Sequence, residues 1–264
     1  MTKQLRRTAG FLIRTENTLI HVDPGPGAVV YLNKLGIDMR NLTAVIVSHN
    51  HLDHANDAAV LVEGMTNGGR RKRGAFLGSA YAIEGGDDFV PALSPYHRNM
   101  LQVCKAVKPG EETEIGNLHV RFTPTWHDEP TGVGVFFSDG RVRVAYLSDT
   151  GYLEELAQEL EHFKPHAIIF NLIFDSEEIV PHTTTGSVVK FLEAYRPSLV
   201  LLQHFGAKIL LKHMEKKIAK DLSTRFGVDV RALSDGDVID LPLKTQTTLA
   251  SFMEGENEGR SCEE

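Results

Sequence analysis

Short apolar runs that end in polar residues recur along the chain and predict buried strands. Within several of these runs apolar and polar positions alternate, which is the period of a strand with one buried face. Turn residues separate neighbouring runs, as Ser138-Asp139-Gly140 does. We expect strands at residues 11–13, 19–22, 45–47, 118–122, 132–137, 142–147, 167–172, 199–203, 228–232 and 238–241.

Apolar positions with helical spacing predict helices between these strands. The segments are 28–35, 55–65, 153–162, 187–195 and 210–226. The least regular part is 67–100, which is rich in glycine and holds Pro91 and Pro95. Long irregular segments often serve binding, so we interpret 67–100 as a lid or a substrate-facing insertion. Three of its residues could contact a substrate, without any one standing out: Tyr96, His97 and Arg98.

The order of the elements predicts a single large domain of the mixed α/β class. Strands dominate the first part of the chain and then alternate with helices, which favours sheets covered by helices. We place this domain at residues 1–242. The remaining residues, 243–264, are polar and rich in glycine and glutamate, a composition typical of a disordered tail.

One six-residue stretch carries the clearest chemistry: His49-Asn50-His51-Leu52-Asp53-His54, which follows the strand at 45–47. A rigid strand that ends in a loop presents functional side chains at the edge of a sheet. Neutral imidazole suits zinc, manganese or iron, and a carboxylate adds the charge to hold a second cation. A histidine-rich surface loop is the alternative, but it gives Asp53 no reason to stand among three histidines.

This stretch resembles the HxHxDH signature of the metallo-β-lactamase superfamily. The resemblance implies a four-layered αβ/βα sandwich with a two-metal site at one edge. It also implies that His49 and His51 bind one metal ion, while Asp53 and His54 bind the other. The family's pattern continues with a single histidine, an aspartate at a strand end and a final histidine.

All three later landmarks are found at the ends of expected strands. His127 follows residues 120–126 and on its own would be read as structural. Asp149 follows 142–147 and resembles the family's bridging aspartate, although it could also be the N-cap of the helix at 153–162. His204 follows the strand at 199–203 and stands in Leu-Gln-His-Phe, which resembles the segment of the family's last ligand, with Gln203 in place of the usual threonine.

The resemblance therefore implies that His127 joins His49 and His51 on the first ion, that His204 joins Asp53 and His54 on the second, and that Asp149 bridges the two. It further implies an orienting role for Asp23, which begins an Asp-Pro-Gly turn. Such a residue fixes the tautomer of a ligand histidine. A turn-initiating role for Asp23 is compatible with this one.

His182 bears on the type of reaction. It stands in Pro-His-Thr-Thr-Thr-Gly before the helix at 187–195, and this segment resembles one in phosphodiesterase branches of the superfamily, including RNase Z. A histidine near the leaving oxygen can donate a proton to the departing alkoxide. The alternative is a neutral loop histidine beside the helix N-cap.

Charge and cysteine content limit the kinds of partner and the cellular compartment that we expect. The formal net charge of −7 gives no global electrostatic case for nucleic acid. The basic run Arg70-Arg71-Lys72-Arg73 could attract a phosphorylated substrate, although a solvated loop is the favoured interpretation. Cys104 and Cys262 form no disulfide framework, and no apolar run reaches eighteen residues, so we expect a cytoplasmic protein without a membrane span.

Between His127 and Asp149 there is room only for a hairpin, so the long tRNA-holding arm of RNase Z-like enzymes is excluded there. We therefore predict a two-metal hydrolase, with zinc or manganese and with iron also admissible, acting as a phosphodiesterase on a small or cyclic phosphodiester. A metal-held hydroxide would attack, and the catalytic residues would be Asp53, Asp149 and His182. A lactonase or amidase on the same metals is the alternative, and a metal-binding protein without turnover is the second. No sequence feature indicates whether the protein forms a homo-oligomer.

Overall fold

The structure is a computed structural model and describes residues 5–86 and 88–242. The predicted tail at 243–264 lies outside these residues. Two sheets form the centre of the molecule. The first has five strands in the order β1-β2-β3-β4-β5, and all neighbours are parallel except β1 and β2. Its strands are β1 (Phe11–Arg14), β2 (Leu19–Val22), β3 (Ala44–Val47), β4 (Ala75–Gly78) and β5 (Val103–Ala106).

The second sheet has seven strands in the order β12-β11-β10-β9-β8-β7-β6. Strands β6 to β9 pair antiparallel, and β9 to β12 pair parallel. Its strands are β6 (Glu112–Ile115), β7 (Leu118–Pro124), β8 (Val133–Ser138), β9 (Arg143–Tyr146), β10 (Ala167–Asn171), β11 (Leu199–Gln203) and β12 (Asp229–Ala232).

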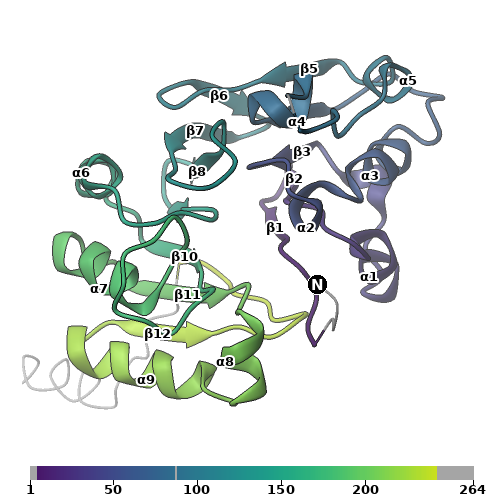
Figure 1. The fold of residues 1–264 in the computed structure, drawn as a ribbon. Coiled ribbons are helices and arrows are strands. Elements are labelled where there is room, and N and C mark those ends of the chain that lie inside the picture. Colours follow the sequence, from purple (N-terminus) through teal and green to yellow (C-terminus); the bar gives the residue numbers. More distant parts are fainter. Residues whose placement is uncertain (1–4, 87, 243–264) are drawn as a thin grey trace, which may run out of the picture.

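The helices cover the outer faces of both sheets (Figure 1). They are α1 (Ala28–Lys34), the 3-10 turn η1 (Met39–Asn41), α2 (Leu52–Ala55), α3 (Ala58–Met65), α4 (Ala80–Glu84), α5 (Pro95–Arg98), α6 (Glu154–Phe163), α7 (Thr185–Ala194), α8 (Ala207–Leu211) and α9 (Glu215–Phe226). One buried cluster joins the two sheets to each other, and two more join each sheet to its own helices. Helix, sheet, sheet and helix are thus the four layers that the sequence implied.

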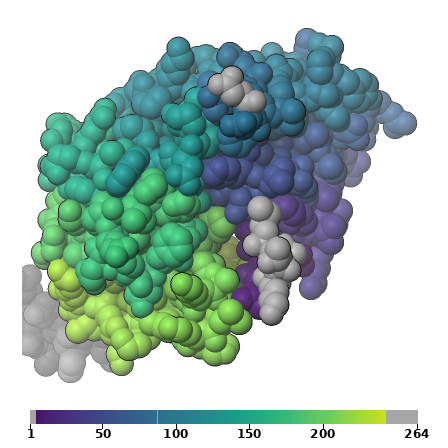
Figure 2. Space-filling view, viewed as in Figure 1, coloured from purple at the N-terminus to yellow at the C-terminus, as the bar shows by residue number. Residues whose placement is uncertain are grey.

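The boundary between the two halves positions the site. In Figure 2 the N-terminal half, purple to blue, and the C-terminal half, teal to yellow, meet along one continuous boundary. The segments after β3, β7, β9 and β11 carry the seven candidate metal ligands, whereas Asp23 follows β2 and His182 follows β10. Because buried strands fix where these segments begin, residues far apart in the chain arrive at one place.

Two expected helices differ in the structure. The helix expected at 55–65 begins only at Ala58, as α3, after the N-cap Asp57, whose Oδ2 accepts hydrogen bonds from Gly27 N and Val29 N at the start of α1. A separate helical turn, α2, precedes it, so Asp53 and His54 lie on a helical turn instead of a loop. The second divides into α8 and α9 at His213, whose φ of 54° is incompatible with a continuous helix.

Part of the segment 67–100 is not an insertion. It contains β4, which lies between β3 and β5 in the first sheet, and α4 packs against β4 and β5. The substrate-facing role expected for this segment stays a prediction. Strands β5 and β6 were not predicted, because VCKA is short and interrupted by a lysine and ETEI is short and largely polar. The expected strand at 238–241 does not form.

Candidate metal centre

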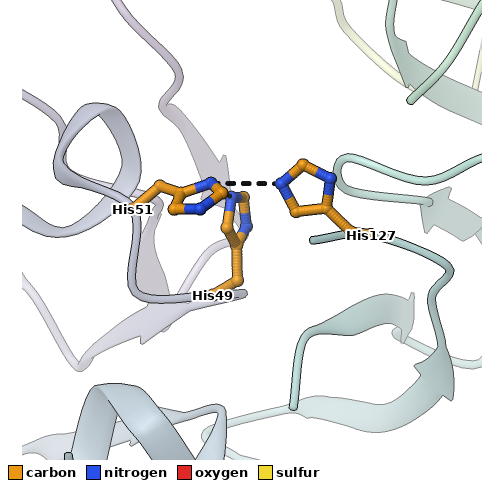
Figure 3. Close-up of side chains that lie close together, drawn as sticks. All are labelled: His49, His51 and His127. Atoms are coloured by element: carbon orange, nitrogen blue, oxygen red, sulfur yellow. Dashed lines mark hydrogen bonds between the residues drawn. The ribbon is translucent and has the colours of Figure 1, made fainter. Parts of the chain in front are cut away.

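Three imidazoles form the first group of the site, and Figure 3 shows His127 reaching toward His49 and His51 from the opposite side. His49 Nε2 lies 3.1 Å from His51 Nδ1, and His127 Nε2 lies 3.1 Å from the same His51 atom. His49 and His51 follow β3, whereas His127 follows β7 of the other sheet. The two halves of the molecule therefore build this group together.

Hydrogen bonds on the outer side of the rings set their tautomers. His127 Nδ1 lies 2.9 Å from the Pro181 carbonyl oxygen, which can only accept, so Nδ1 carries the proton and Nε2 keeps a lone pair. Ser48 Oγ donates to the Asp23 carboxylate, so it can accept the proton of His49 Nδ1, 3.1 Å away. His49 and His127 thereby present lone pairs to the centre of the group.

The second group consists of Asp53, His54 and His204. The two Nε2 atoms of His54 and His204 lie 3.1 Å apart, and Asp53 Oδ2 lies 3.5 Å from His204 Nε2. His204 follows β11 and has a φ of 50°, a left-handed conformation that turns the chain directly at the strand end. As in the first group, ligand-type atoms from both halves converge.

Asp149 lies between the groups, as the sequence implied. Its Oδ2 is 3.6 Å from His54 Nε2 and 3.8 Å from His204 Nε2, and its ligand-type atom also groups with that of His49. Asn171 Nδ2 donates to Asp149 Oδ1 at 2.6 Å. Asp149 is not a helix cap, because α6 begins at Glu154 after an N-cap at Leu153.

Asp23 is a buried carboxylate that accepts four hydrogen bonds, one of them from His54 of the second group. Ser48 donates through its backbone N at 2.7 Å and its Oγ at 2.8 Å, and Tyr146 donates through its hydroxyl at 2.5 Å. His54 Nδ1 lies 3.0 Å away, so that ring donates from Nδ1 and directs Nε2 toward His204. Asp23 is thus placed where an orienting residue would act.

The charges of the site favour cations. Burial alone would lower the pKa of His54, but the carboxylates of Asp149 and Asp23 outweigh burial and raise that pKa to about 10. Burial would raise the pKa of Asp149, yet the neighbouring imidazoles of His54 and His204 hold it well below its usual range. Burial lowers the pKa of His49, which keeps that imidazole neutral and able to bind a metal ion.

These residues fit divalent metal ions. In each group the ligand-type atoms lie within 4.8 Å of one another. Ligands at about 2.0–2.1 Å from a tetrahedral zinc ion are separated by roughly 3.3 Å, which is close to the separations here. The Nε2 lone pairs of His49 and His127 both face His51 Nδ1 at 3.1 Å, an arrangement that a cation between the three rings would stabilise.

His182 lies beside the first group. Its ring centroid is 4.7 Å from that of His127, and the two rings meet edge to face. Burial and the neighbouring His127 lower the pKa of His182. The residue belongs to the loop between β10 and α7, one residue after Pro181, whose carbonyl orients His127. A proton donor at His182 and a metal ligand at His127 would thus be positioned by the same loop.

Two residues of the site were missed by sequence reasoning. Tyr146 and Asn171 end β9 and β10, and the Asn171 amide donates both to the Tyr146 hydroxyl and to Asp149. Gln203, noted only as a departure from the family pattern, donates to Asn171 Oδ1 at 3.0 Å. A polar residue at the end of a buried strand was the available signal, since Asn171 closes Ala-Ile-Ile-Phe-Asn.

Other sequence candidates lie elsewhere. Residues 70–73 precede β4, and because β3 and β4 are parallel this run lies at the sheet end opposite to His49. Arg73 donates to the carbonyls of Arg40 and Leu42. His97 on α5 is 3.3 Å from Glu63 of α3, on the outer side of the first sheet. Among the described residues, every helix is too short or too polar to cross a membrane.

Comparison with known proteins agrees with this geometry. A family model described as a beta-lactamase superfamily domain matches residues 18–205. The chain therefore belongs to the metallo-β-lactamase superfamily, which confirms the resemblance carried by the HxHxDH stretch. The metallo-β-lactamase fold protein YhfI from Bacillus subtilis superposes with a TM-score of 0.72 at 19% identity, covering 89% of this chain and 92% of that one.

Two relatives are similar in sequence. An uncharacterized protein of Methanocaldococcus jannaschii is 32% identical over 230 residues, which are 86% of this chain and 85% of that protein. A ribonuclease Z of Methanopyrus kandleri is 28% identical over 131 residues, which are 48% of this chain and 42% of that enzyme. The second relative matches over less than half of either protein.

Proposed function

We propose that this protein is a two-metal-dependent hydrolase that cleaves a small or cyclic phosphodiester. The observation that carries the proposal is the convergence of two groups of ligand-type side chains, from opposite sheets, on either side of Asp149. Two bound divalent ions would supply an activated water as nucleophile and would polarise the phosphoryl group, whose phosphorus atom is attacked. Zinc and manganese both suit this mixture of imidazole and carboxylate.

Each residue of the site would have its own role. His49, His51 and His127 would hold one ion, Asp53, His54 and His204 the other, and Asp149 would contact both. Asp23 would keep His54 in the tautomer that directs Nε2 inward. Because both groups are largely buried, their geometry would be set before substrate arrives.

A phosphodiester is favoured over other esters by the histidine beside the first group. His182 could protonate the leaving oxygen of an alkyl phosphodiester, whose alkoxide leaves poorly without a proton. Its lowered pKa leaves it mostly neutral near pH 7, and the negative charge of a bound diester would raise that pKa toward the useful range. The partial match to a ribonuclease Z gives independent support.

Hydrolysis of bis-p-nitrophenyl phosphate by metal-stripped protein, reloaded separately with Zn²⁺ and Mn²⁺, tests the proposal. Asp53→Asn is the blank, because it replaces a carboxylate of the second group. We expect turnover that requires metal and is lost in this variant. An absence of turnover with both ions would reject the phosphodiesterase and direct the same assay to lactones and amides.

His182 has a test of its own. With an alkyl leaving group, His182→Asn should lower kcat by about 10²–10⁴-fold, the range typical of a lost proton donor. With p-nitrophenolate, which leaves without protonation, the loss should be much smaller. His162→Asn, an exposed histidine on α6, is the matched control. Equal losses with both leaving groups would show that His182 is not the proton donor.

A further inference from the structure

Aromatic side chains gather beside the first group of the metal centre. Among the described residues, three aromatic side chains are classed as exposed: Tyr96 at 63%, Phe174 at 41% and Trp126 at 40%. Trp126 and Phe174 both adjoin the site, whereas Tyr96 is on α5. Isolated exposed apolar residues are ordinary on a protein surface. Two exposed aromatics at one site are a more specific feature.

Phe174 and Phe89 each lie beside a histidine of the site. The Phe174 ring centroid is 5.7 Å from that of His182. Phe89, which is half-buried, lies with its ring centroid 5.9 Å from that of His51. The rings of His182 and His51 both pack against that of His127. Together with Trp126, three separate segments of the chain therefore each place one aromatic ring near the first group.

Trp126 directly precedes His127, and its ring is held at the edge of the site by Gly151. A Cβ built on Gly151 would come within 2.4 Å of the Trp126 ring and 2.2 Å of the Val180 carbonyl oxygen. A residue with any side chain at 151 would therefore displace the ring. Val180 in turn pairs with His182, so the Trp126 ring lies near the segment that carries this histidine.

Two exposed aliphatic residues adjoin the site in the chain. Leu52, within the HxHxDH stretch, and Val90 are both exposed. The carbonyl of Val90 accepts a hydrogen bond from Asn50 Nδ2 at 2.8 Å, and so does the carbonyl of Tyr81, which ties the segment that carries Phe89 to the metal-binding loop. We call Phe89, Trp126 and Phe174 the aromatic rim. Phe174 also lines a pocket of about 350 Å³ together with Val180.

From this arrangement we propose that the substrate's ester carries a planar aromatic group, bound between Phe89, Trp126 and Phe174. The proposal rests on the proposed function in that the phosphoryl group would lie at the metal centre beside this rim. Flat rings stack on aromatic faces without needing particular hydrogen bonds, so the rim would select an aryl group over a small alkyl group. The phosphoryl group would supply the negative charge that the metal centre binds. The aryl group would account for most of the selectivity between substrates.

Trp126 supplies a direct measurement of binding, because it is the only tryptophan of the chain. Titrating the protein, in the presence of Zn²⁺ or Mn²⁺, with phenylphosphonate and with methylphosphonate should change its fluorescence in proportion to occupancy. We expect phenylphosphonate to bind about tenfold more tightly, which corresponds to about 1.4 kcal/mol. Phe174→Ala should remove most of this preference, and Tyr96→Ala, the matched exposed aromatic on α5, should keep it.

The outcomes separate this proposal from the proposed function. Selective binding of phenylphosphonate without hydrolysis of any phosphodiester would keep the aromatic site and reject the phosphodiesterase. Equal affinity for the two phosphonates, or no binding of either, would overturn the aromatic site even if bis-p-nitrophenyl phosphate is hydrolysed. Phe89→Ala provides a second variant from another segment, and thermal unfolding verifies that each variant is folded.

Discussion

Asp23 shows at the scale of a single residue how the site is held. Its carboxylate is fully buried and receives four hydrogen bonds, from two groups of Ser48, from Tyr146 and from His54. An amide has only one oxygen and turns a donor toward some of these groups. We therefore expect Asp23→Asn to lower the free energy of unfolding by about 2–4 kcal/mol. Metal affinity should fall by about 10–100-fold.

Urea unfolding and competition with a chelator measure the two effects. Asp38→Asn is the control, because Asp38 is an exposed carboxylate that pairs only with Arg40 in the same turn. That variant should resemble the parent in both measurements. If Asp23→Asn bound metal as tightly as the parent, the orienting role of Asp23 would be refuted.

His21 makes a prediction about pH. It is buried on β2, and burial lowers its pKa to about 4, in spite of the opposing charge of Asp23. In the unfolded chain its pKa is about 6.5, so between these values the unfolded state binds a proton that the folded state does not. The contribution of neutral His21 to the free energy of unfolding is therefore complete above about pH 6.5 and is lost as pH falls toward 4.

Between about pH 7.5 and about pH 5 this residue should account for roughly 2 kcal/mol of the fall in stability. Urea unfolding in the presence of a chelator, at both pH values, measures it without a contribution from bound metal. His21→Leu should show a shallower fall than the parent. His162→Leu, an exposed histidine, should show the parent's fall, and a parent-like fall in His21→Leu would contradict the prediction.

At the scale of elements, the turn after β11 decides where His204 points. Gly206 has a φ of −60°, so its backbone would accept any residue. A Cβ built there, however, would lie 1.9 Å from the Ile173 carbonyl oxygen, which means that the turn packs against the strand end of β10 without space for a methyl group. Gly206→Ala should therefore force the two segments apart and move His204.

We expect Gly206→Ala to lower the free energy of unfolding by about 1–3 kcal/mol, as overpacking does. It should also weaken metal binding. Gly36→Ala is the comparison, because that position has open space but a φ of +69°. Its cost should be about 1 kcal/mol from the backbone alone, with unchanged metal affinity. Unfolding curves and metal content measure both, and full metal binding by Gly206→Ala would contradict the argument.

At the scale of the whole molecule, bound metal should link the two sheets. His51 belongs to the first half and His127 to the second, and the same holds for His54 and His204. Ions that bind only the folded protein stabilise it by about 4 kcal/mol when present at about 1,000 times their dissociation constant. For a chain of this size we expect removal of metal to lower Tm by roughly 8–16 °C.

Differential scanning calorimetry of metal-loaded and stripped protein checks this expectation. His204→Asn should reduce the difference in Tm between the two forms. His213→Asn, an exposed histidine whose left-handed backbone asparagine tolerates, should retain the parent's difference. Identical Tm values for loaded and stripped parent protein would show that these residues do not hold metal across the two halves.

The sequence alone determined the residues that meet at the site. His49, His127, Asp149 and His204 each follow a strand that is apolar or alternates apolar and polar residues, and this local pattern is visible without any knowledge of the fold. The HxHxDH resemblance then predicted how the strands are layered. Local signals were weakest for β5 and β6, which are short strands at sheet edges, and for β4, which is short and surrounded by glycine.

The tertiary structure decided which atoms face the centre and which residues hold them. The network of Tyr146, Asn171 and Asp23 joins side chains more than a hundred positions apart, and no local pattern encodes such pairings. The same is true of the aromatic rim, because Phe89, Trp126 and Phe174 come from three unrelated segments. Burial patterns depend on neighbours within a few residues, whereas hydrogen-bond partners and shared surfaces depend on how whole layers pack.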